Sequence, residues 1–260
     1  MREIRIYQDA VLKPEHKVVL DALGSNHLTR VLRVRVQDSV TLFNGDGYDY
    51  RAEVVAIDRR AMTLLVLEQI KVAAESPLNV ELGLALSKGE RFDWAIQKAT
   101  ELGVSRITPL FSERVEVKLP EDRIAKKQQH WQQVVISACE QSGRTVVPQV
   151  MPANTLQQWC TQVEADCKLM LHHHEPAGLA EQAPQRIALL IGPEGGLSDV
   201  DIEQAIKAGF AAWRIGPRVM RTETAPAAAL AVLGARWGDL SDSESSRGRK
   251  SIIVPNKAAS

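Results

Sequence analysis

The first part of the chain alternates apolar and polar residues with a period of two. In the run YDYRAEVV, residues 48–55, aromatic or apolar residues from Tyr48 to Val54 stand at every second position, with charged residues between them. This alternation predicts a strand with one buried face. The preceding Asn44-Gly45-Asp46-Gly47 is typical of a tight turn, so the runs on both sides of it predict a hairpin.

Two further stretches complete this first region. The apolar run AMTLLVLEQI at 61–70 predicts another strand, and SNHLTRVLRVRV at 25–36 predicts one short helix with Ser25 as its N-cap. Residues 1–72 are therefore expected to form a small β-barrel.

The pattern changes after the linker KVAAESP at 71–77. From Leu78 on, apolar runs typical of buried strands alternate with stretches in which apolar residues recur every three or four positions. RFDWAIQKATELG, for example, places Phe92, Ile96 and Ala99 on one helix face. Strands that alternate with helices predict an α/β domain with a mainly parallel sheet over residues 73–240. Residues 241–260 are polar without periodicity and predict a disordered tail.

Composition narrows the class of protein. The 260 residues include 32 Lys and Arg against 32 Asp and Glu, which argues against a surface that coats nucleic acid throughout but allows a local basic patch. No apolar run is long enough for a membrane span, and MREIR does not resemble a signal peptide. The three cysteines lack CxxC spacing and are expected to be reduced, and no base stands beside Cys139. We expect a cytoplasmic protein without a membrane partner.

A glycine-rich turn, Gly192-Pro193-Glu194-Gly195-Gly196 in LLIGPEGGLS, follows a predicted strand and precedes a predicted helix. Ligands of parallel sheets bind at the carboxyl ends of the strands. A phosphate cradle uses such glycines but avoids a carboxylate, so Glu194 favours a neutral, hydroxylated or cationic ligand. The alternative is a structural turn with Glu194 in solvent or at the N-terminus of the next helix. The chain has no GxGxxG motif, which disfavours a dinucleotide site.

A second Gly-Pro loop occurs in RIGPRVMRTETAPAAAL, residues 214–230. It again follows a strand, and it leads through Arg221 and Glu223 into an alanine-rich helix. Small residues allow close backbone approach, although a helix packed tightly within its own domain would need them as well. The run His172-His173-His174 is not expected to bind a metal, because neighbouring residues of a strand point to opposite faces and no set of ligands accompanies them.

These motifs together carry a family resemblance. LLIGPEGG, IGPRVMRTETA, LMLHHHE, ITPLFSERV and ACEQSGR resemble the motifs of the ribosomal RNA small-subunit methyltransferase E family, over about residues 2–240. The resemblance implies an N-terminal PUA-like β-barrel, a C-terminal SPOUT-class α/β domain with a trefoil knot, and a homodimer. It implies methylation of N3 of one uridine of 16S rRNA in the small ribosomal subunit, with S-adenosylmethionine as donor. The tail beyond Leu240 departs from the family's usual end.

The resemblance also implies a donor site made by three loops. Its predicted residues are Leu171 and His172; Ile191, Gly192, Pro193, Glu194, Gly195 and Gly196; and Ile215, Gly216, Val219, Met220, Arg221, Thr224 and Ala225.

Methylation at uracil N3 requires removal of a proton or stabilisation of the uracil anion. Arg221 is the candidate for charge stabilisation, and Glu223 is the candidate for accepting the proton or orienting Arg221. An ion pair that only shapes the loop is the alternative. Candidates for RNA contact are Arg2, Arg5, Arg30, Arg33 and Arg35 in the barrel, and Lys88, Arg91, Arg114, Lys118 and Arg144 beyond it.

Two other functions fit the same sequence. One is a SPOUT enzyme that methylates a ribose 2′-hydroxyl of rRNA. The other is a non-catalytic RNA-binding assembly protein that retains the fold, which donor binding would exclude.

Overall fold

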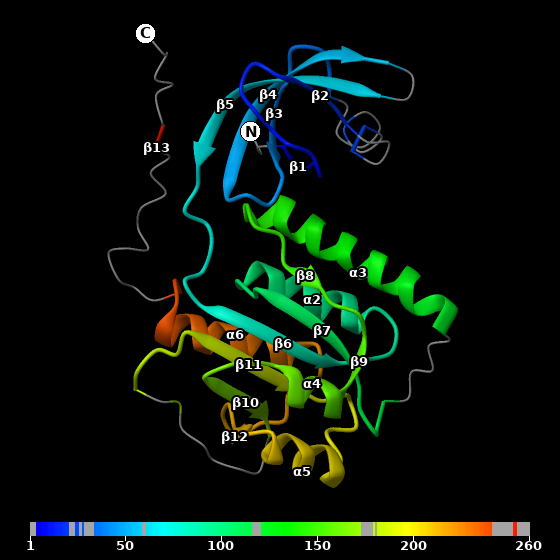
Figure 1. Ribbon diagram of the computed structural model, residues 1–260, viewed down its shortest axis with the longest axis vertical. Helices are drawn as coiled ribbons and strands as arrows, with labels where there is room; N and C mark the ends of the chain where they lie inside the picture. Colours follow the sequence, from blue (N-terminus) through cyan, green and yellow to red (C-terminus); the bar gives the residue numbers. More distant parts are fainter. Residues whose placement is uncertain are drawn as a thin grey trace. The chain divides into compact units, whose positions relative to one another are not determined.

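The computed structural model describes residues 4–20, 24–25, 28, 34–58, 61–115, 121–172, 179, 181–240 and 252–253. The chain divides into two compact units (Figure 1). The first is built from residues 1–75, 139–147 and 247–260, and the second from residues 76–138 and 148–246. The predicted boundary near residue 72 lies close to the first of these divisions, but the first unit also includes the later segment 139–147.

The first unit contains a sheet in the order β1-β3-β4-β5-β13, with β2 also paired to β5. The strands are β1 (Arg5–Tyr7), β2 (Lys17–Val19), β3 (Ser39–Phe43), β4 (Tyr48–Ile57), β5 (Met62–Lys71) and β13 (Ile252–Ile253). β1 runs parallel to β3, and the other pairs are antiparallel. The predicted hairpin around residues 44–47 is confirmed, and both of its glycines adopt positive φ.

The alternation of apolar and polar residues in β4 buries one face of the strand, as predicted, with one exception. Tyr50, Ala52 and Val54 lie in the core of this unit, while Arg51 is exposed. Asp49 is buried as well, because its carboxylate forms an ion pair with the buried guanidinium of Arg5. The pattern of charges alone could not indicate that one charged position of the strand has a buried partner.

A second buried arginine joins this cluster. Arg144 forms an ion pair with Glu75 at 2.7 Å, and its backbone carbonyl accepts a hydrogen bond from Arg5 Nη2 at 2.9 Å. The side chains of Arg5 and Arg144 are only 8% and 7% exposed. The structure therefore accounts for both arginines without RNA, although both were candidates for RNA contact.

Other predictions for this part fall partly outside the described residues. Ser25 is buried, and its hydroxyl donates to the Leu20 carbonyl and accepts from the Met62 amide, while most of the expected short helix lies beyond the description. In the predicted tail, β13 pairs with β5, and the rest of 241–260 is not described.

The second unit contains a sheet in the order β12-β10-β11-β6-β7-β8, with β9 also paired to β7, and every pair is parallel. Its strands are β6 (Asn79–Ala85), β7 (Arg106–Phe111), β8 (Gln149–Val150), β9 (Asn154–Thr155), β10 (Cys167–Leu171), β11 (Arg186–Ile191) and β12 (Ala211–Trp213). The expected parallel α/β domain is confirmed. β11 is buried at every position from Ile187 to Ile191, so both faces of the sheet are covered.

The helices are α2 (Arg91–Glu101), α3 (Glu121–Ser142), α4 (Leu156–Gln162), α5 (Asp199–Lys207) and α6 (Thr224–Trp237). α2 packs against α6, and α4 packs against α5 (Figure 1). The predicted capping box opens α5: the Ser198 hydroxyl accepts from the Asp201 amide, and the Asp201 carboxylate accepts from the Ser198 amide. No helix within the described ranges has the length and apolar character needed to cross a membrane.

Candidate functional site

Three neighbouring strands end at the same edge of the parallel sheet. β10 lies between β12 and β11, and all three run in the same direction. The segments that follow their carboxyl ends begin at His172, Gly192 and Arg214, and the His172 amide donates to the Trp213 carbonyl at 2.9 Å. Together these segments line a cavity of about 630 Å³. Such an edge is where parallel sheets bind ligands.

The predicted donor residues meet in this cavity. All of them line it except Gly216 and Thr224. Sequence reasoning missed other lining residues, among them Trp213, Arg214 and Arg218, which belong to the same strand end and loop as the residues it named.

The segment 192–196, which we call the glycine loop, requires glycine at two positions for local structural reasons. Gly196 has φ of +70°, a conformation that L side chains rarely adopt, and its amide donates to the Pro193 carbonyl at 2.9 Å. A Cβ at Gly192 would lie 2.9 Å from Leu197 Cγ, so a side chain there would displace Leu197. The loop thus folds back tightly and presents backbone to the cavity.

Glu194 has partners on another loop of the same unit. Its Oε1 accepts from Arg91 Nη1 at 3.0 Å and from the Lys88 amide at 3.3 Å. Partial burial raises the pKa of the Glu194 carboxyl, but hydrogen bonds from its own backbone, from Arg91 and from Lys88 outweigh this effect and lower the pKa below its usual value. The carboxylate therefore connects the glycine loop to Lys88, between β6 and α2, and to Arg91, the first residue of α2.

Arg114 holds the same loop through its backbone. Its Nη1 donates to the carbonyls of Gly195 and Leu197 at 3.1 and 3.2 Å. Lys88, Arg91 and Arg114 were candidates for RNA contact, and the structure shows that all three contact the glycine loop. We call the contacts of Glu194 with Lys88 and Arg91, and of Arg114 with the two carbonyls, the loop anchor.

Arg221 and Glu223 lie at the cavity with different exposure. Arg221 Nη1 is 3.9 Å from Glu223 Oε1, a long ion pair, and the side chains are 80% and 19% exposed. The Arg221 carbonyl accepts from the amides of Thr224 and Ala225, which fixes the backbone of the loop at the start of α6. The guanidinium is therefore accessible to a ligand, while the carboxylate is partly sheltered.

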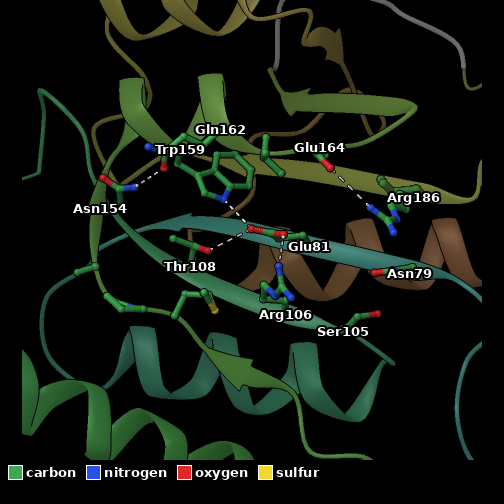
Figure 2. A pocket seen from close by; sticks show the side chains of 15 residues that line it. Asn79, Glu81, Ser105, Arg106, Thr108, Asn154, Trp159, Gln162, Glu164 and Arg186 are labelled. Carbon is green, nitrogen blue, oxygen red and sulfur yellow. Dashed lines mark hydrogen bonds and ion pairs between the residues drawn. The ribbon is translucent and has the colours of Figure 1, made fainter.

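A second cavity, of about 690 Å³, lies at the opposite ends of the strands (Figure 2). Glu81 lies within it and accepts from Trp159 Nε1 at 2.9 Å, from Thr108 Oγ1 at 3.3 Å and from Arg106 Nη1 at 3.4 Å. Because this carboxylate is engaged by the protein's own donors and the cavity lies at the amino ends of the strands, it is a weaker candidate for the principal ligand site.

Several predicted residues cannot be placed. Arg2, Arg30, Arg33, Lys118, His173 and His174 lie outside the described residues. Arg35 is described and exposed. Within the described part of the chain, no group of three or more His, Cys, Asp and Glu side chains is arranged to hold a metal ion.

Comparisons with known proteins define the class. A family model for the RNA methyltransferase domain matches residues 74–234, and one for the PUA domain of RNA methyltransferases matches residues 24–67. The chain is 34% identical over 240 residues to ribosomal RNA small subunit methyltransferase E of Buchnera aphidicola subsp. Schizaphis graminum, covering 91% of this chain and 98% of that protein. It is 31% identical over 219 residues to the protein of that name from Bacillus subtilis, covering 80% and 86%.

Two solved structures of methyltransferases are also similar to this chain. The enzyme of that name from Neisseria gonorrhoeae, bound to S-adenosyl methionine, has a TM-score of 0.87 at 37% identity, with 92% of this chain and 100% of that chain covered. A Legionella pneumophila methyltransferase in complex with the same cofactor has a TM-score of 0.89 at 39% identity, with the same coverage. The protein is an RNA methyltransferase with a PUA-like N-terminal domain. It belongs to the ribosomal RNA small subunit methyltransferase E family.

Proposed function

We propose that this protein methylates N3 of one uridine of 16S rRNA in the small ribosomal subunit, with S-adenosylmethionine as donor. The observation that carries the proposal is the convergence of three loops on one cavity, with Arg221 and Glu223 at its margin. The relatives' name supports the rRNA substrate, and the two solved relatives bind the same donor.

The cavity fits this donor in size and chemistry. Its volume of about 630 Å³ lies within the range of small-molecule sites. The donor has ribose hydroxyls, an amine and a carboxylate but no phosphate, and the glycine loop offers backbone groups at close approach. The negative charge of Glu194 is already balanced by Arg91, so it does not oppose the donor's carboxylate. When bound, the donor supplies a methyl group on a positively charged sulfur, which keeps the bonding electron pair on transfer.

The protein must prepare the acceptor. Uracil N3 carries a proton at neutral pH, and we assign its acceptance to the Glu223 carboxylate, whose partial shelter from water favours a direct hydrogen bond. The exposed Arg221 guanidinium donates to a uracil carbonyl oxygen, where negative charge develops as the proton leaves. Bond formation at N3 then leaves a neutral methylated base.

The family resemblance adds two parts to the proposal. The three loops of the cavity form a trefoil knot, and the protein acts as a homodimer in the cytoplasm. In support, Val219 in the third loop is 79% exposed and Val232 on α6 is 38% exposed. Apolar side chains with this exposure suit a partner surface, and Val219 also lines the cavity.

We also propose that the N-terminal domain contributes to RNA binding. Arg35 is an exposed cation there, and Arg2, Arg30 and Arg33 extend the basic set in the sequence. Arg5 and Arg144 are committed to ion pairs inside the first unit, so the proposed RNA surface does not depend on them.

The test is methylation of small subunits from a strain that lacks this protein. Wild-type protein and donor should produce 3-methyluridine, identified by nucleoside mass spectrometry, and a reverse-transcription stop at one uridine, because the methyl group blocks the pairing edge. Arg221→Ala should remove the product, and donor affinity should fall far less than activity because the variant keeps the Arg221 backbone that lines the cavity. Arg186→Ala, which removes an exposed arginine at the amino end of β11, is the matched control and should retain activity.

Other products would contradict the proposal. A ribose-methylated nucleoside with read-through would identify a 2′-O-methyltransferase. Donor binding absent from wild-type protein would identify a non-catalytic RNA-binding protein.

A further inference from the structure

A third hollow adjoins the cavity of about 630 Å³, which we call the donor cavity because we propose that it binds S-adenosylmethionine. It has a volume of about 730 Å³, and it lies between the start of α2 and the start of α6. Arg91 and Glu223 line both this hollow and the donor cavity. A group bound in the hollow therefore contacts the same two side chains as the donor site, one of which is the proposed proton acceptor.

The hollow contains an exposed tryptophan. Trp94 is 43% exposed, whereas Trp131, Trp159 and Trp213 are buried at 3–4%. The buried face of α2 is made by other residues, including Phe92, Ala95 and Ile96. Packing of α2 therefore does not account for an indole at position 94, and its large apolar surface is available to a ligand.

The charges of the hollow favour a neutral planar ligand. The lining contains two cations, Lys88 and Arg91, and two carboxylates, Glu90 and Glu223, and Arg91 is already paired with Glu194 outside it, so no excess positive charge is present to select a phosphate. An exposed indole is a surface on which nucleobases stack, and single-stranded bases are commonly bound in this way. Lys98 Nζ lies 6.0 Å from the centre of the Trp94 ring.

We propose that this hollow receives the target uracil, with Trp94 as its stacking surface and the N3 edge directed to Glu223. The inference rests on the proposed function and adds the site of the acceptor base. The uracil must leave its RNA stack to reach the donor, and an indole next to the donor cavity compensates for the lost stacking. Trp94 is then a positioning residue, which holds the base while other groups perform the chemistry.

The experiment compares Trp94→Ala and Trp94→Phe under single-turnover conditions, with unmodified small subunits as substrate. Stacking on one aromatic ring corresponds to about a tenfold effect, so Trp94→Ala should lower the rate at subsaturating subunits about tenfold. Trp94→Phe keeps a ring and should recover most of the rate. Calorimetric affinity for S-adenosylhomocysteine should not change in either variant. Ile206→Ala, which removes an exposed apolar side chain from α5, is the matched control.

Four results would overturn the inference. They are an unchanged rate in Trp94→Ala, equal losses in Trp94→Ala and Trp94→Phe, a parallel loss of donor affinity, and a shift of a wild-type dimer to monomer in sedimentation of Trp94→Ala. The last would make Trp94 an interface residue. Failure of the proposed function is separate, because it appears as the absence of 3-methyluridine with the wild-type protein.

Discussion

The loop anchor gives a sharp prediction for donor affinity. Glu194→Gln keeps an oxygen that can accept from the Lys88 amide but removes the charge that pairs with Arg91. Arg91→Met removes the same ion pair from the other side. If the pair holds the glycine loop in its binding-competent form, each variant should weaken donor binding, and the double variant should be little worse than either one.

The expected loss of donor affinity can be estimated from the solvent exposure of the Arg91 and Glu194 side chains. The two side chains are 49% and 36% exposed, and an ion pair of this kind contributes up to about 1 kcal/mol. Loss of the pair can therefore weaken donor binding by no more than about 1 kcal/mol, which corresponds to about a fivefold increase in Kd. Glu194→Ala also removes the acceptor that the glycine loop offers to the Lys88 amide, and a loss of about tenfold in donor affinity is expected for this variant.

The assay is calorimetric titration with S-adenosylhomocysteine at low and high salt. Because salt screens exposed charges, the difference between wild type and Glu194→Gln should shrink at high salt. Two results would refute the reasoning. Additive losses in the double variant would show that the pair does not act as a unit. A large loss for Glu194→Gln with none for Arg91→Met would show that Glu194 contacts the donor directly.

The anchor also predicts a pH dependence. The pKa of Glu194 in the folded protein lies below its ordinary value of 4.5, so its charged form is favoured by folding. The contribution of the pair is therefore complete well above pH 4.5 and is lost as pH falls below that value towards the folded pKa. Donor affinity near neutral pH should not vary through Glu194, and the gap between wild type and Glu194→Gln should close in acid.

Three further outcomes are expected. Gly195→Val should abolish donor binding in calorimetry but leave the melting temperature nearly unchanged, since a Cβ there meets Arg114 only at 3.7 Å; unaltered affinity would remove Gly195 from the site. Asp49→Asn should lower the free energy of unfolding by about 3 kcal/mol in urea titration, because the buried Arg5 guanidinium loses its carboxylate partner and keeps the Arg144 carbonyl as a hydrogen-bond acceptor. Glu68→Gln, which breaks a more exposed pair, should change that free energy little. Burial raises the pKa of the Cys139 thiol to about 12, so mass mapping should find it unlabelled by iodoacetamide at pH 8 in native protein; rapid labelling would show that it is accessible.

The sequence could predict the cavity that we propose for the donor because two of its three loops carry local signals. A strand that runs into Gly-Pro can be identified without knowledge of its neighbours, and Gly192 and Ile215 each lie at or next to such a strand end, whereas Leu171 was predicted only through the family resemblance. Parallel strands bring their carboxyl ends to one edge of a sheet. Once β12, β10 and β11 are adjacent, the three loops must meet.

The partners of charged residues could not be predicted in this way. Glu194 lies 103 residues from Arg91 and 106 from Lys88, and no periodicity connects them. Arg5 and Asp49 are likewise 44 residues apart. The sequence does not distinguish an exposed arginine from one that is paired within the protein. Basic residues in predicted loops were therefore interpreted as RNA contacts, whereas the structure pairs them with a carboxylate or a carbonyl.

The buried cluster of the first unit has a consequence for recombination between relatives. Arg5 donates a hydrogen bond to the Arg144 carbonyl, the Tyr7 amide donates to Glu140, and Glu75 forms an ion pair with the Arg144 guanidinium. A crossover just after Glu75 would therefore transfer residues 1–75 of the first unit without the nine residues from Cys139 to Val147 that complete it. Chimeras of two parent genes should survive only when both segments come from the same parent, so this domain is inherited as two linked pieces and not as a single N-terminal cassette.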